Sequence, residues 1–246
     1  MKIAVVIPTY NERENIKSLF ERIFSYLPDS TILIVDDNSP DGTAGVVREL
    51  QKNDKRIFLL NREKKDGLGS AYRDGFRYLF SLGTFDKIVM MDGDGSHDPS
   101  YLPQMVAGGD PGLVTLGSRY VKGGGTENWE FWRRMLSYWG NFYSRLITGL
   151  PIKDCTAGFH CIGTKLLSRL PLDKFHASGY AFLIELKYYL WEEGAKFREV
   201  PIVFANRESG ASKMSNHIIR EGIITPWRLR LKDLLRNEFR NENFKF

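Results

Sequence analysis

Short apolar runs recur along the first half of the chain and predict a set of buried strands. The runs are rich in Val, Ile and Leu, contain almost no polar positions, and are mostly followed by Pro, Asp or Gly. Continuous rather than alternating hydrophobicity over so few residues is typical of strands that are buried on both faces. The predicted strands are Ile3–Ile7, Ile32–Val35, Ile57–Leu60, Lys87–Met91 and Leu113–Leu116.

Two segments between these runs have apolar residues at helical spacing instead. The first predicted helix is Glu12–Leu27, where Asn11 and Glu14 stand three residues apart and predict a capping box at the N-terminus. The second is Leu68–Leu82, which has its aromatic residues on one face. Strands that alternate with helices predict right-handed crossovers and a mostly parallel central sheet flanked by helices, an α/β Rossmann-like fold.

The second half of the chain has a different pattern. Three consecutive glycines at 123–125 predict a flexible hinge, and Pro201 places its strand near a sheet edge. Pro226 suits the first turn of a basic C-terminal helix. We expect a catalytic domain over residues 1–215 and a basic amphipathic helical segment over 216–246. Further predicted elements are helices at Trp129–Leu146 and Tyr180–Glu192 and strands at Gly158–Gly163 and Lys196–Phe204.

Composition narrows the class of protein. A chain of 246 residues with 42% hydrophobic residues is long enough for one large domain with a sizeable core. Cys155 and Cys161 cannot form the disulfide framework of a small secreted protein, and with His160 they supply only three of the four ligands of a zinc site. The net charge of +5 is modest, but the signs are separated along the chain, with basic residues at 119–134 and 228–236 and acidic residues at 36–41 and 92–98.

Membrane contact is expected at a surface rather than across the bilayer. No run of ~18 apolar residues occurs, and the first residues lack the apolar stretch of a signal peptide. Residues 131–150 carry three arginines and are typical of a soluble or interfacial helix. In the tail at 224–236, Trp and Leu lie on one side and basic residues elsewhere. This pattern fits a helix on an anionic membrane, and equally a helix packed on the catalytic domain.

The strand ends predict where a ligand binds. In a doubly wound sheet, ligands lie outside the carboxyl ends of the strands, so segments 8–12, 36–43, 92–94 and 117–120 should meet at one rim. Neither a dinucleotide-binding nor a P-loop glycine motif is present. Asp92 and Asp94 follow a buried strand and are separated by a glycine, so they could converge on Mg²⁺ or Mn²⁺, although the same residues also suit a solvated turn.

The motifs taken together resemble those of the GT-A glycosyltransferases of family 2 and, more narrowly, of the polyprenyl-phosphate (dolichyl-phosphate) mannose synthases. The resemblance covers the chain from about Ile3 to Ser215. It is specific because the whole set occurs in order, whereas the aspartate pair alone would be weak. The motifs are PTYNE at 8–12, DDNSPDGT at 36–43, KKDGLGSAYRDGF at 64–76, MDGDGSHDP at 91–99, GSRY at 117–120, DCTAGF at 154–159 and RESGASK at 207–213.

This resemblance implies a function. It implies a metal-dependent inverting enzyme that moves mannose from GDP-mannose to dolichyl or polyprenyl monophosphate, giving a β-linked product. UDP-glucose as the donor, or a non-catalytic module that binds nucleotide sugars, remain alternatives. The expected partners are the membrane surface and an integral-membrane subunit, and no nucleic acid. The expected location is cytoplasmic, peripheral at the cytoplasmic face of a membrane.

The resemblance also assigns residues. The nucleotide-sugar site is matched by Pro8, Tyr10, Glu12, Asp37, Asp92, Gly93, Arg207 and Lys213, the last two with Ser212 in a loop that closes over the diphosphate in relatives. The metal ligands are matched by Asp92 and Asp94, with Ser96 where some relatives supply a third. The acceptor phosphate is matched by Arg119, Arg133 and Ser137, which with Asp94 form the catalytic set. Asp154 and Glu185 match acidic positions near the sugar and the acceptor, and either could instead be a structural hydrogen-bond acceptor. His97 follows the metal pair.

Overall fold

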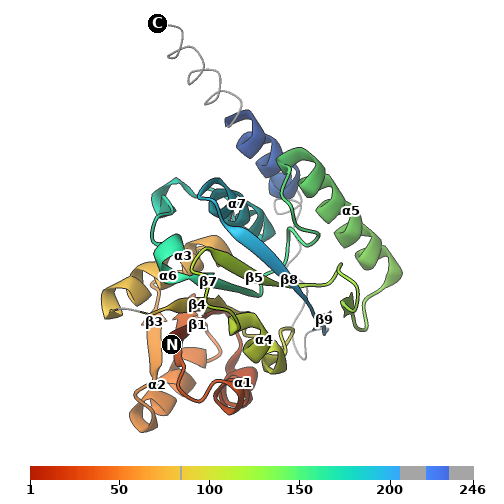
Figure 1. Ribbon diagram of the computed structural model, residues 1–246. Helices are drawn as coiled ribbons and strands as arrows, with labels where there is room; N and C mark the ends of the chain where they lie inside the picture. The colour runs from red at the N-terminus through yellow and green to blue at the C-terminus, as the bar shows by residue number, and fades with distance from the viewer. Residues whose placement is uncertain (84, 206–219, 233–246) are drawn as a thin grey trace, which may run out of the picture.

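A seven-stranded sheet forms the centre of the molecule (Figure 1). The computed structural model describes residues 1–83, 85–205 and 220–232. The strand order is β3-β2-β1-β4-β7-β5-β8, and every neighbouring pair is parallel except those that β7 makes with β4 and β5. The mostly parallel sheet is therefore confirmed. The strands are β1 (Ile3–Thr9), β2 (Thr31–Asp36), β3 (Ile57–Asn61), β4 (Lys87–Met90), β5 (Leu113–Ser118), β7 (His160–Gly163) and β8 (Lys196–Pro201).

Helices cover both faces of this sheet and enclose two apolar cores. One core lies under α1 and α2, where Ile16, Leu19 and Ile23 of α1 pack against β1 and β2. The other lies under α3 and α7, where Tyr72 and Phe182 stack with ring centroids 5.9 Å apart. The helices are α1 (Arg13–Tyr26), α2 (Thr43–Asn53), α3 (Leu68–Leu82), α4 (Leu102–Val106), α6 (Thr164–Leu167) and α7 (Gly179–Glu192), with short 3-10 turns at Pro99–Tyr101 and Leu172–Lys174.

Two further helices stand outside these layers, on the side of the molecule away from α1 and α2 (Figure 1). They are α5 (Phe131–Thr148) and the helical residues 220–232. The Tyr143 hydroxyl of α5 donates to the Ile223 carbonyl at 2.9 Å, so the two helices touch. Among the helices that the structure describes, none combines the length and the apolar character that crossing a bilayer needs.

The structure corrects two local predictions. Helix α1 begins after Glu12, which makes no side-chain cap, and Asn11 has a left-handed φ of 63°, so the capping box was wrong. The glycines at 123–125 are not a hinge. A Cβ on Gly124 would come within 2.4 Å of the Ser118 carbonyl, and Gly125 lies in β6 (Gly125–Thr126). Gly124 thus allows the backbone to pack closely against Ser118 and Arg119. Strand β6 pairs with β9 (Val203–Phe204).

One predicted strand is divided, and the helices α2, α4 and α6 were not predicted. The strand expected at Lys196–Phe204 forms β8 at the sheet edge, as Pro201 indicated, and then the separate strand β9. Helix α2 was absent from the sequence-based elements because only Thr43, Ala44 and Val47 of its residues are buried, which leaves a short apolar stripe.

Candidate active site

The loops that follow β1 and β2 are joined into one rim by the buried carboxylate of Asp36. It accepts hydrogen bonds from the Thr9 hydroxyl (2.9 Å) and from the Ser39 backbone N–H (2.8 Å) and hydroxyl (2.6 Å). Ser39 in turn accepts from the Asn11 N–H at 3.0 Å. Asn11 and Asn38 both have left-handed φ angles, which asparagine tolerates better than most residues. The first two motif loops are thus held side by side, as the strand-end rule predicts.

Asp37 links this rim to the loop before α3. Its carboxylate accepts from the Arg62 guanidinium and from the backbone N–H groups of Asp66 (3.3 Å) and Gly67 (3.2 Å). Tyr10 lies nearby on the same rim, with the Lys65 ammonium 3.7 Å from its ring centroid. The rim therefore combines an oriented carboxylate with an aromatic face and cations, a set that can hold a base, a ribose and phosphates.

Asp92 and Asp94 follow β4 with different environments. Asp94 is buried, and Ser96 donates to its Oδ1 from both N–H (3.1 Å) and hydroxyl (2.5 Å). Asp92 lines an open pocket, and its N–H donates to His97 Nδ1 at 3.0 Å. The His97 ring is stacked on Phe159 with centroids 5.0 Å apart. Ser96 thus fixes the carboxylate of Asp94, and His97 fixes the backbone of Asp92.

The carboxylate pair suits a hard divalent ion whose other ligands come from substrate. Mg²⁺ and Mn²⁺ prefer oxygen ligands and usually keep waters or substrate phosphates in their coordination shell. Within the described residues, no group of three or more His, Cys, Asp or Glu side chains could hold a metal by itself. Asp92 and Asp94 therefore fit an ion that is completed by a diphosphate, and they do not form a closed structural site.

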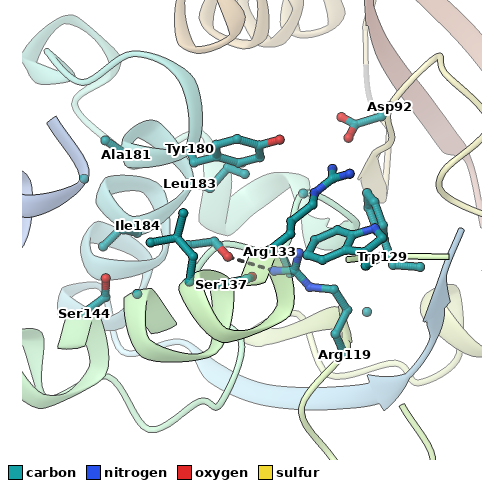
Figure 2. Close-up of a pocket in the computed structure, with 18 of the residues that line it drawn as sticks. Asp92, Arg119, Trp129, Arg133, Ser137, Ser144, Tyr180, Ala181, Leu183 and Ile184 are labelled. Atoms are coloured by element: carbon teal, nitrogen blue, oxygen red, sulfur yellow. Dashed lines mark hydrogen bonds between the residues drawn. The ribbon is translucent and has the colours of Figure 1, made fainter. Parts of the chain in front are cut away.

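A pocket of about 800 Å³ adjoins Asp92 and extends between α5, α7 and residues 220–232. In Figure 2, Asp92, Arg119, Trp129 and Arg133 gather on one side, and Ser144, Ala181 and Ile184 lie on the opposite side. The pocket therefore has an ionic end and an apolar end. The lining includes the polar residues Asp92, His97, Arg119, Arg133 and Ser137 and the apolar residues Leu136, Leu183, Ile184 and Ile223.

Arg119 is held in the ionic end by a buried two-point ion pair. Its Nε and Nη2 donate to the two carboxylate oxygens of Asp154 at 2.8 and 2.7 Å, and Nη2 also donates to Thr156 Oγ1. Burial alone would raise the pKa of Asp154, but the guanidinium outweighs it and keeps that pKa below its usual value. The same carboxylate raises the pKa of Arg119 against the effect of burial. Arg119 is thus a fixed positive charge, and Asp154 orients it.

Arg133 and Ser137 come from one face of α5. The Arg133 guanidinium lies 4.1 Å from the Trp129 ring centroid, and Figure 2 shows its side chain directed toward the side of the pocket where Asp92 lies. The Tyr120 hydroxyl donates to Ser137 Oγ at 2.7 Å. The structure thus brings all three predicted acceptor residues and Asp92 to one pocket.

Sequence reasoning missed Lys187, a fully buried ammonium group beneath this site. Its Nζ donates to the carbonyls of Cys155 (3.0 Å), Ala157 (2.8 Å) and Leu183 (3.3 Å). Burial lowers its pKa to about 7. The bonds fix the segment that carries Asp154. The available signal was a lysine in the mostly apolar centre of α7, where a buried cation needs several acceptors.

Several predicted residues lie elsewhere. Arg207, Ser212 and Lys213 are outside the described residues. Glu185 accepts from the N–H groups of His176 (3.1 Å) and Ala177 (2.9 Å) and from Arg228 (3.0 Å), so it caps a turn and anchors residues 220–232. Burial raises the pKa of Cys155 to about 12 and that of Cys161 to about 11, so both remain neutral thiols.

Comparisons with known proteins agree with the motifs. Residues 4–174 match the model of the family described as Glycosyl transferase family 2. The chain is 38% identical over 231 residues to undecaprenyl-phosphate mannosyltransferase of Micrococcus luteus, covering 93% of this chain and 95% of the relative. It is 41% identical over 230 residues to polyprenol monophosphomannose synthase of Mycolicibacterium smegmatis, covering 92% and 86%.

Solved structures share the fold at low identity. Mannosyl-3-phosphoglycerate synthase from Rubrobacter xylanophilus superposes with a TM-score of 0.66 at 17% identity, over 97% of this chain and 75% of that one. Glucosyl-3-phosphoglycerate synthase from Mycobacterium tuberculosis, in complex with Mn²⁺, uridine-diphosphate and glucosyl-3-phosphoglycerate, gives 0.62 at 18% identity, over 93% and 79%. These similarities support the GT-A fold.

Proposed function

The chain belongs to glycosyl transferase family 2, as its motifs predicted, and we propose that this glycosyltransferase moves mannose from GDP-mannose to a polyprenyl monophosphate. The observation that carries the proposal is the two-ended pocket. It places a carboxylate and two arginines at one end and an apolar wall at the other. A lipid phosphate has the complementary form, with an anionic head and an apolar chain. The two relatives named above act on substrates of this class by name.

The donor is assigned to the rim and to the aspartate pair. Pro8, Tyr10, Glu12, Asp37 and Gly93 would hold the nucleoside, and Arg207 and Lys213 would close over the diphosphate. Asp92 and Asp94 would hold Mg²⁺ or Mn²⁺, with Ser96 orienting Asp94 through its hydroxyl. A bound divalent ion supplies charge neutralisation for the nucleoside diphosphate as it leaves.

The acceptor phosphate is assigned to Arg119, Arg133 and Ser137. A phosphate monoester is largely ionised near neutral pH, so no general base is needed to generate the nucleophile. The protein's contribution is to gather two anions and to hold them in line. An acceptor oxygen forms the new bond to C1 of mannose while the bond from C1 to the GDP oxygen breaks, so the configuration inverts and GDP leaves.

Because the proposed acceptor is a lipid, we place the enzyme peripherally at a membrane surface, on its cytoplasmic side. Support comes from α5, which buries Asn141, Ser144 and Thr148 and exposes its aromatic residues. A helix that turns its polar side inward and its apolar side outward suits an interfacial position. The exposed residues of α5 are Phe131, Trp132, Met135, Leu136, Tyr138, Trp139, Phe142 and Leu146. An integral-membrane subunit could cover part of the same surface.

A transfer assay tests this function. Labelled GDP-mannose and labelled UDP-glucose are each incubated with polyprenyl phosphate in detergent, with Mg²⁺, with Mn²⁺ or with excess chelator. We expect label from GDP-mannose in an acid-labile lipid product, and none with chelator. Lost charge neutralisation is worth several kcal/mol, so Asp94→Ala should lower the rate at least about a hundredfold.

Asp98→Ala is the matched control, because Asp98 lies on the same loop but forms an exposed pair with Arg22 at 2.9 Å. Its rate should stay within about twofold of the unaltered protein. Transfer of label from UDP-glucose and not from GDP-mannose would show that the donor is UDP-glucose. Undiminished transfer in excess chelator would remove the metal from the proposal.

A further inference from the structure

Among the described residues, two of the helical glycines that lack a packing contact, Gly140 and Gly222, lie in the pocket wall. Glycine inside a helix costs roughly 0.5–1 kcal/mol relative to alanine, so its presence usually reflects close packing. Gly69 and Gly75 of α3 fit that rule, since an added Cβ would lie 2.8 Å from the Ala177 carbonyl and 2.8 Å from Val6 Cγ2, respectively.

Gly140 of α5 and Gly222 of the helical residues 220–232 do not fit that rule. A Cβ on either would meet no described atom within 4 Å, and both line the pocket. Their missing side chains leave room in the cavity itself.

These glycines lie beyond the phosphate end of the pocket. Along α5 the pocket is lined in turn by Arg133, Ser137, Gly140 and Ser144, which share one helical face. At 1.5 Å per residue this face runs about 16 Å from Arg133 to Ser144. Gly140 therefore sits where a chain attached to a phosphate at Arg133 and Ser137 would pass, and Gly222 lies on the other helix of the same wall.

The apolar end of the pocket is continuous with the exposed apolar surface. Leu136 and Ile223 both line the pocket, yet they are 46% and 53% exposed. Figure 2 shows the neighbouring small and aliphatic wall, Ala181, Leu183 and Ile184, on the side away from Asp92. A ligand with its anionic head at the arginines can thus leave the pocket over the exposed apolar surface of Leu136 and Ile223.

We propose that Gly140 and Gly222 determine acceptor specificity by keeping open a slot for the isoprene units that follow the one attached to the acceptor phosphate. The inference rests on the proposed function and adds to it that chain recognition begins inside the pocket. A larger residue at either position would block the polyprenyl chain of the acceptor. It would leave both the phosphate site and the nucleotide rim unaltered.

The test compares acceptors of two lengths in Gly140→Leu and Gly222→Leu. Mannosyl transfer is measured with a long polyprenyl phosphate and with the phosphate of a single isoprene unit, and GDP binding is measured by titration calorimetry. We expect kcat/KM for the long acceptor to fall at least tenfold, kcat/KM for the short acceptor to change less than threefold, and GDP affinity to stay constant. Gly45→Leu on α2 is the control, since its Cβ also meets nothing within 4 Å and it does not line the pocket.

Leucine is a better helix former than glycine, so the variants should unfold at or above the temperature of the unaltered protein. Three results would contradict the proposed slot. They are equal losses of kcat/KM for both acceptors, unchanged transfer to the long acceptor in both variants, and a loss of GDP binding. These results differ from failure of the proposed function, in which the unaltered protein itself would transfer mannose to neither acceptor.

Discussion

Arg133 and Arg134 are adjacent in sequence and differ in surroundings. Arg133 lines the pocket and lies over Trp129, whereas Arg134 is exposed on another face of α5. A hydrogen bond to a charged group contributes about 1.5–3 kcal/mol. We therefore expect Arg133→Ala to raise KM for the polyprenyl phosphate roughly 10–100-fold with GDP affinity unchanged, while Arg134→Ala changes neither. Steady-state kinetics and GDP titration measure both. An equal loss of donor and acceptor affinity in Arg133→Ala would contradict the acceptor assignment.

Lys187 gives a prediction that depends on pH. Its pKa is about 7 in the folded protein against an ordinary 10.5, so between these pH values the unfolded chain binds one proton more. Stability from this group therefore rises with pH across that window. From pH 7 to pH 9 the free energy of unfolding of the unaltered protein should gain about 2 kcal/mol relative to Lys187→Met.

Urea denaturation at the two pH values measures this difference. Lys196→Met is the control because its side chain is 77% exposed, and it should show no such change. A constant difference between the unaltered protein and Lys187→Met would mean that Lys187 keeps an ordinary pKa.

At the scale of elements, the sequence predicts best where periodicity and burial agree. The strands β1 to β5 and helix α3 were predicted within a few residues because each has a clear apolar pattern. Helix α5 was also predicted, but its buried residues Asn141, Ser144 and Thr148 are polar, and its apolar residues are mostly exposed. The strand-end rule located the rim. The partners of Arg119 and Lys187 could not be predicted, because no strand-end rule or helical spacing relates Arg119 to Asp154 or Lys187 to Cys155, which lie 35 and 32 positions apart.

The outer face of α5 should bind membranes. Fully burying an aromatic side chain contributes about 1.5–3 kcal/mol, so even partial insertion of two rings is substantial. We expect Trp139→Ser with Phe142→Ser to lower the partition coefficient onto phosphatidylglycerol-containing vesicles at least tenfold, measured by co-sedimentation. Tyr26→Ser on α1, also an exposed aromatic, is the control and should leave binding unchanged. If the unaltered protein, the double variant and Tyr26→Ser bind vesicles equally well, α5 does not contribute to membrane binding.

At the scale of the whole molecule, residues 220–232 are fastened to the catalytic domain and also present an apolar surface. Glu221 accepts from Ser178, Arg228 pairs with Glu185, and Lys232 donates to the Tyr189 hydroxyl at 2.8 Å. Two of the basic residues expected to meet anionic lipid are therefore engaged by the protein. Of the two sequence-based alternatives for this segment, packing on the catalytic domain is therefore confirmed for one side of the helix, and membrane contact stays a prediction for the other side.

Leu229 and Leu231 lie on different sides of this helix, so substituting them tests the two roles separately. Leu229 is 2% exposed and belongs to the core under α7, whereas Leu231 is 53% exposed. Leu229→Ala should lower the free energy of unfolding by about 2–5 kcal/mol, because it leaves a cavity. Leu231→Ala should change it by less than about 0.5 kcal/mol and weaken vesicle binding. Urea denaturation and co-sedimentation measure both, and vesicle binding that depends on neither leucine would restrict this helix to packing. A deletion from residue 226 cannot separate the two roles, since it removes both leucines.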